Sequence, residues 1–151
     1  MGIALQKAEK IFEQAIGTSG QDERVLYDNL ICAIDANDTP ELQALSAKAR
    51  LNKGVSLAQE NRLPEAITVF EDLQKSCAAS PLTAVRALAA AAMVNRGFVL
   101  ALQQNTLQAL AAYDDVVDCF GEATEIELLE QVCLLYTSPS PRDSTLDLVC
   151  R

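Results

Sequence analysis

The sequence repeats itself with a period of 43 residues, and no other feature constrains the fold as strongly. The segment YDNL at 27–30 recurs as FEDL at 70–73 and as YDDV at 113–116. A second match joins LNKG at 51–54 to VNRG at 94–97, again 43 residues apart. Because separate segments share one offset, we infer a structural unit that occurs about three times.

Each unit predicts two α-helices joined by a short turn. Thr39 followed by Pro40 is typical of a helix start, because the hydroxyl can cap free N–H groups and proline is tolerated at the first helical position. Ser80 followed by Pro81 predicts a second start by the same reasoning, and the capping box TEIE at 124–127 predicts a third. The expected helix pairs span about 2–34 (helices 2–16 and 21–34), 40–77 (40–60 and 63–77) and 82–120 (82–104 and 106–120), with a truncated helix from 124.

The expected fold class is therefore all-α, with about three helix pairs. No stretch alternates apolar and polar residues as a half-buried strand would. Half of the 151 residues are hydrophobic, which is enough for one domain with a real core. A generic helical bundle is the alternative, although a bundle does not require a recurrence every 43 residues.

Two glycines are expected inside long helices, where glycine is about 1 kcal/mol less favourable than alanine. Gly54 and Gly97 therefore indicate that a neighbouring helix passes close by. Twelve residues after each glycine the sequence has alanine, then an aromatic residue four further on and an apolar residue three beyond that. The expected repeat-packing residues are Gly54, Ala66, Phe70, Leu73, Gly97, Ala109, Tyr113 and Val116.

This spacing of glycine, alanine and aromatic residue resembles the tetratricopeptide repeat, in a long, bacterial-type form, over 47–117. The first unit departs from the pattern, with Ile11 in place of glycine and Glu23 in place of alanine. The period also exceeds the family's usual value of about 34 and falls in the range of HEAT-type helical repeats. Longer helices and linkers such as 76–80 would account for the surplus.

The resemblance implies a right-handed solenoid of helix pairs whose first helices line a concave groove for a peptide or a partner helix. The alternative for each groove position is that its side chain only packs against the next helix. Carried over by position, and three or four residues apart on one helix face, the groove residues are Lys48, Leu51, Asn52, Val55, Gln59, Ala91, Val94, Asn95, Phe98 and Leu102.

Charge limits the partners. With 12 basic and 21 acidic residues, the net charge of -9 disfavours nucleic acid and anionic membranes, so we expect a protein or peptide partner. Basic residues exceed acidic ones on the expected first helices at 40–60 and 82–104, whereas the second helices are net acidic. A groove lined by first helices would therefore favour a partner with apolar and some acidic side chains.

The residues needed for most catalysis are missing. The chain has no histidine and no glycine-rich phosphate loop, and its five cysteines form no CxxC pair, so we expect no enzyme, no metal and no cofactor. Cys32, Cys77 and Cys119 are expected to be small buried hydrophobes near helix ends. The expected role is a non-catalytic interaction scaffold; the alternatives are a regulatory or sensor segment of a multidomain enzyme and a self-association module.

A cytoplasmic location is the expectation. The N-terminal residues 1–16 carry charges at helical spacing rather than the regions of a signal peptide. The most apolar stretch, 87–94, lies between Arg86 and Arg96 and is far shorter than the roughly 20 residues of a membrane span.

The last 19 residues differ in kind from the rest. Residues 133–143, CLLYTSPSPRD, are similar to translated adapter DNA of sequencing libraries, and DLVCR at 147–151 can be read from the adapter's next segment. We therefore expect 133–151 to be an artefactual tail rather than a domain, and 1–132 to be a fragment of a longer repeat protein. Self-association through the truncated C-terminal end would follow. The alternative is a natural Pro/Ser linker.

Overall fold

A computed structural model describes residues 2–35 and 38–120 of the chain, and all regular secondary structure in this part is helical. The expected all-α class is thereby confirmed for the described residues. The helices are α1 (Leu5–Ile16), α2 (Gly20–Ala33), α3 (Pro40–Gln59), α4 (Leu63–Cys77), α5 (Thr83–Leu102) and α6 (Thr106–Phe120). The helix expected from 124 and the tail at 133–151 lie outside the described residues.

Of the two N-caps predicted for α3 and α5, one is found in the structure and the other is not. At α3, the Thr39 hydroxyl accepts a hydrogen bond from the Leu42 backbone N–H at 3.5 Å, and proline is the first helical residue. The start expected at Ser80 is wrong, because α5 begins only at Thr83. The Ser80 hydroxyl accepts instead from the Leu82 N–H at 3.2 Å, so it stabilises a turn before the helix.

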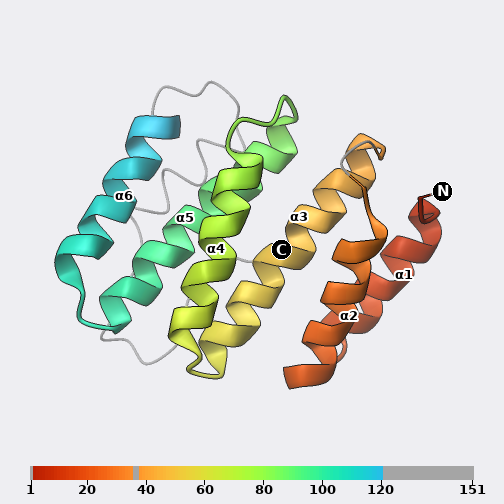
Figure 1. The fold of residues 1–151 in the computed structure, drawn as a ribbon, viewed down its shortest axis with the longest axis horizontal. Coiled ribbons are helices and arrows are strands. Elements are labelled where there is room, and N and C mark those ends of the chain that lie inside the picture. Colours follow the sequence, from red (N-terminus) through yellow and green to blue (C-terminus); the bar gives the residue numbers. More distant parts are fainter. Residues whose placement is uncertain (1, 36–37, 121–151) are drawn as a thin grey trace.

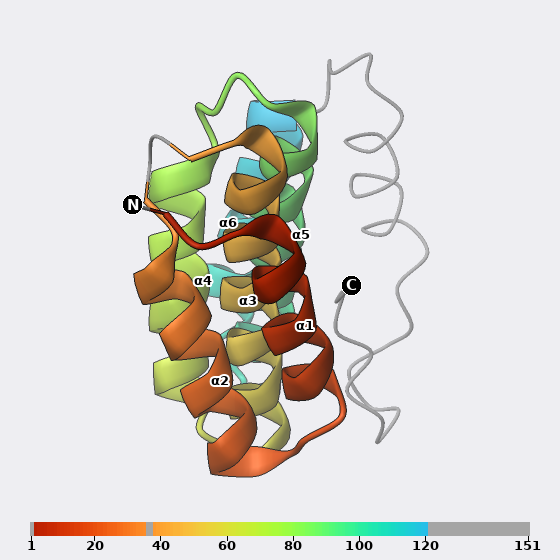
Figure 2. The same cartoon turned by 90° about the vertical axis from the view of Figure 1, so that its right-hand side faces the viewer.

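The helices stand side by side in chain order from α1 to α6, and each packs on the next (Figure 1). The first helices of successive pairs also pack together, α1 on α3 and α3 on α5. Seen along the row, α1, α3 and α5 form one layer, and α2 and α4 lie in the other (Figure 2). Among the described helices, no backbone contact joins α2 to α4 or α4 to α6, so side chains of α3 and α5 are accessible between them.

The largest apolar cluster joins α3, α4 and α5. Phe70 and Leu73 of α4 are fully buried there against Leu51 of α3 and Val99 of α5. A second cluster, around Tyr27, joins α1, α2 and α3. The helix α5 packs on α3, α4 and α6, and most of its residues are buried. By length and composition α5 could also cross a membrane, but a buried core helix passes the same test.

The turns that end α3 and α5 are alike. Asn61 and Gln104, 43 residues apart, both adopt left-handed backbone conformations with φ of 62°. Just after each of them, a backbone N–H closes the helix end by bonding back to a leucine carbonyl: Arg62 to Leu57 at 2.9 Å and Asn105 to Leu100 at 3.0 Å. The same reversal therefore follows both first helices at the period seen in the sequence.

Candidate functional site

Each mid-helix glycine faces an aromatic ring of the following helix. A Cβ added at Gly97 would lie 2.5 Å from Cε1 of Tyr113, and one added at Gly54 would lie 2.9 Å from both Cδ1 and Cζ of Phe70. Side-chain Cβ atoms essentially never come this close to other heavy atoms. Glycine at these two positions therefore lets the two helices of a pair approach until ring and backbone touch.

The other repeat-packing residues are also interior. Ala66 and Leu73 of α4 share the large cluster with Phe70. In α6, Ala109 packs beside Leu100, and Val116 packs with Met93 of α5. The eight residues singled out by spacing thus line the contact between first and second helices.

The first helix pair is packed differently. With Ile11 at the glycine position, the Tyr27 ring meets Phe12, with the ring centroids 5.9 Å apart. The buried Asn52 side chain of α3 donates a hydrogen bond from Nδ2 to the Tyr27 hydroxyl at 3.3 Å. This bond ties the first pair to the second.

The predicted groove residues fall into two groups. Lys48 and Gln59 are exposed and Leu102 is half-buried, so a partner could touch these three side chains directly. Most of the others pack on neighbouring helices: Asn52 on Tyr27, and Leu51 with Phe98 in the α3–α5 cluster. The buried members of the set are Leu51, Asn52, Val55, Ala91, Val94, Asn95 and Phe98.

Ion pairs join each second helix to the next first helix. Lys53 Nζ of α3 lies 2.6 Å from Asp28 Oδ1 of α2. Forty-three residues later, Arg96 Nη1 of α5 lies 3.8 Å from Glu71 Oε1 of α4 and donates to Gln74 Oε1 at 3.0 Å. The contact between helix pairs therefore repeats in position and in sign of charge.

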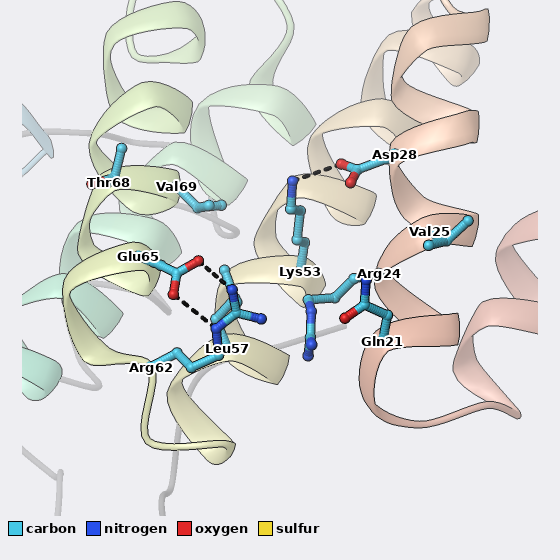
Figure 3. A pocket seen from close by; sticks show the side chains of 10 residues that line it. All are labelled: Gln21, Arg24, Val25, Asp28, Lys53, Leu57, Arg62, Glu65, Thr68 and Val69. Carbon is cyan, nitrogen blue, oxygen red and sulfur yellow. Dashed lines mark hydrogen bonds and ion pairs between the residues drawn. The ribbon is translucent and has the colours of Figure 1, made fainter.

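A groove runs between α2 and α4, with α3 as its floor, and encloses about 410 Å³ (Figure 3). The three basic residues that line it each meet a carboxylate: Lys53 meets Asp28, Arg62 meets Glu65 at 2.8 Å, and the buried Arg24 meets Glu60 at 2.8 Å. The Arg24 guanidinium also donates to the Ser56 hydroxyl at 3.3 Å. These pairs neutralise the charges that line the groove. Two of them, Lys53–Asp28 and Arg24–Glu60, also join α2 to α3 and its C-terminal end, whereas Arg62–Glu65 lies within the start of α4.

A second groove, of about 560 Å³, lies between α4 and α6 with α5 as its floor. All of its lining residues except Gln103 stand 43 positions after lining residues of the first groove; Arg96 corresponds to Lys53, Leu100 to Leu57, and Glu71 to Asp28. The change from Arg24 to Ile67 makes this second groove more apolar. The two grooves are one structural feature, repeated.

Two of the arginines in the first groove lower the pKa of the carboxyl groups that they meet. A hydrogen bond from Arg24 holds the pKa of the Glu60 carboxyl below its ordinary value of 4.5. Arg62 lowers the pKa of Glu65 in the same way, and the pKa of Arg62 is raised in return. Glu60 and Glu65 are thus ionised at neutral pH.

Three residues that line the first groove, Arg24, Arg62 and Glu65, are not predicted from the sequence. The 43-residue offset links Lys53 to Arg96 and Asp28 to Glu71, but it gives no signal for these three residues, whose counterparts Ile67, Asn105 and Gln108 are uncharged. One expectation about cysteines is wrong: Cys77 is buried, but Cys32 and Cys119 are exposed. Within 2–35 and 38–120, no three Cys, Asp or Glu side chains are grouped so that they could hold a metal ion.

Comparisons of the chain with protein-family models, with curated proteins and with solved structures find no match.

Proposed function

We propose that this chain is a non-catalytic protein-binding scaffold, a tetratricopeptide-like, right-handed solenoid whose first helices bind a peptide or partner helix. The observation that carries the proposal is the recurrence of the same contacts at 43 residues. The glycine–aromatic contact joins α3 to α4 and α5 to α6, and the ion pair joins α2 to α3 and α4 to α5. Stacked helix pairs of this kind present extended surfaces that suit protein partners.

The partner's chemistry follows from the accessible part of the predicted groove. Lys48 is exposed and carries a positive charge, and Gln59 can donate and accept hydrogen bonds. Leu102 adds a partly accessible apolar surface. We propose a segment with apolar side chains and at least one carboxylate that faces Lys48.

The test uses two fluorescent amphipathic peptides that share one apolar face and carry either glutamate or lysine on the polar face. We expect the acidic peptide to bind more tightly in fluorescence anisotropy. Lys48→Glu should weaken this binding roughly fivefold, the equivalent of about 1 kcal/mol for an exposed charge pair. Lys75→Glu makes the same change at an exposed site on the second helix α4 and serves as the matched control.

The proposal fails if neither peptide binds. It also fails if Lys48→Glu and Lys75→Glu weaken binding equally, because the effect would then come from the net charge of the chain and not from the groove.

A further inference from the structure

The outward face of α6 carries an unusual concentration of exposed apolar side chains. Leu107, Leu110 and Val117 are 84%, 54% and 38% exposed, and they share one helix face with Asp114. Val25 is the one other exposed large hydrophobic side chain among the described residues. Among the described helices, α6 packs on α5 alone. We call Leu107, Leu110, Asp114 and Val117 the α6 outer face.

The repeat shows what such a face does elsewhere in the chain. In α4, the residues 43 positions earlier contact α5: Ile67 packs beside Leu100, and both Glu71 and Gln74 meet Arg96. The α6 counterparts of Ile67, Glu71 and Gln74 are Leu110, Asp114 and Val117. The α6 outer face therefore corresponds to the face of α4 that binds α5. None of the described helices packs on the α6 outer face.

The charges at this position of the repeat indicate which kind of side chain would face Asp114. At this position of the repeat, Asp28 meets Lys53 and Glu71 meets Arg96. Asp114 is exposed and makes no ion pair within the described part of the chain. Because the two equivalent acids each meet a basic side chain, we expect a basic side chain opposite Asp114 as well.

We propose that the α6 outer face binds a helix of a partner protein that presents a lysine or arginine to Asp114 and apolar side chains to Leu110 and Val117. This surface is separate from the first-helix groove. The inference rests on contacts that recur at 43 residues and does not depend on the proposed groove binding.

A second copy of this chain fits the face poorly. Two α6 helices would bring Asp114, Asp115 and Asp118 of each copy together, and like charges repel. The α1 helix of another copy would offer Lys10, which stands 43 residues before Lys53. However, the neighbouring side chains of α1, Gln6, Glu9 and Glu13, are polar and exposed, whereas the residues 43 positions later in α3, Ala49, Asn52 and Ser56, are buried. Such a face cannot bury Leu110 and Val117 and would add two carboxylates.

The test uses a labelled synthetic peptide of residues 39–61, the helix that presents Lys53 to Asp28 in the folded chain, added to the full-length protein. We expect binding that Asp114→Lys weakens roughly fivefold. A peptide with Lys53→Glu should bind the Asp114→Lys protein better than the unchanged protein. Leu110→Gln should weaken binding about tenfold, because apolar burial is lost. Val25→Gln, at the exposed apolar residue of α2, is the matched control and should leave binding unchanged.

Three results would overturn the inference. The first is a monomeric chain that leaves the peptide unbound. The second is a dimer that Leu110→Gln dissolves, since the occupant would then be a second copy. The third is binding that responds to Lys48→Glu and not to Asp114→Lys, which would move the peptide to the first-helix groove. The test of the first-helix groove depends on Lys48→Glu, and the test of the α6 outer face depends on Asp114→Lys. Either proposal can therefore fail while the other holds.

Discussion

Replacing Gly54 by alanine tests the contact on which the helix pairs depend. At an open position in a helix, this change stabilises a protein by about 1 kcal/mol, because alanine is the better helix former. At Gly54 the new Cβ would lie 2.9 Å from two atoms of the Phe70 ring, whereas ordinary contacts begin at 3.4 Å. The ring is fully buried and cannot withdraw without disturbing its neighbours.

The magnitude follows from these two opposing effects. Forcing an extra methyl into a packed interior costs about 1–3 kcal/mol, and the rigid, buried ring places this site in the upper part of that range. After the helix-forming gain is subtracted, we expect Gly54→Ala to lower the free energy of unfolding by about 1–2 kcal/mol. For a chain of this size the melting temperature should fall by roughly 2–8 °C.

Urea unfolding followed by circular dichroism measures the effect, with Gly17→Ala as the control. The nearest atoms to a Cβ at Gly17 are 3.6 and 3.7 Å away, so that change should be close to neutral. In a Phe70→Leu background the obstructing ring atoms are gone, and Gly54→Ala should become stabilising. If Gly54→Ala stabilises the unaltered chain by about 1 kcal/mol, the glycine–aromatic contact is not what requires glycine.

Two further predictions concern acid stability and the tail. Because Arg24 lowers the pKa of Glu60, the stability from this pair is present above about pH 4.5 and is lost as the pH falls through the pKa of the folded state. Glu60→Gln should therefore flatten the fall of the urea midpoint below pH 4.5, and parallel profiles would contradict this. When the coding DNA is sequenced across codons 130–151, the codons for 133–143 and 147–151 should match the adapter base for base, whereas differing codons would make residues 133–151 a natural segment.

The sequence predicted the helices well because the repeat supplied independent signals for each one. The starts of α3, α4 and α6 fall at the expected residues 40, 63 and 106. The error at Ser80 has a local cause: its hydroxyl accepts from Leu82, so it caps a turn and α5 starts later. Serine and proline indicate that a helix is near, but they do not decide between a cap and a turn.

The candidate surfaces were harder to predict than the helices. Helical spacing places Leu51 and Phe98 on one face, but it cannot tell whether that face meets a partner or the next helix. Cys32 and Cys119 are exposed because they lie one turn after Asp28 and Asp115, toward solvent rather than toward the core. Whether such a face is buried or exposed depends on how a third helix packs against it. The sequence of one helix does not contain this information.

The first helix pair separates two kinds of contact that the repeat otherwise combines. Ile11 replaces the glycine there, so the contact within the pair changes, and Tyr27 meets Phe12 instead. The contact between pairs is kept, because Asp28 still meets Lys53 as Glu71 meets Arg96. Stacking of successive pairs therefore does not require the glycine, whereas close approach within a pair does. The acidic residue on the second helix therefore predicts which helix packs on a pair better than the mid-helix glycine does. At Asp114, no basic side chain of the described residues occupies the position that Lys53 and Arg96 take opposite Asp28 and Glu71.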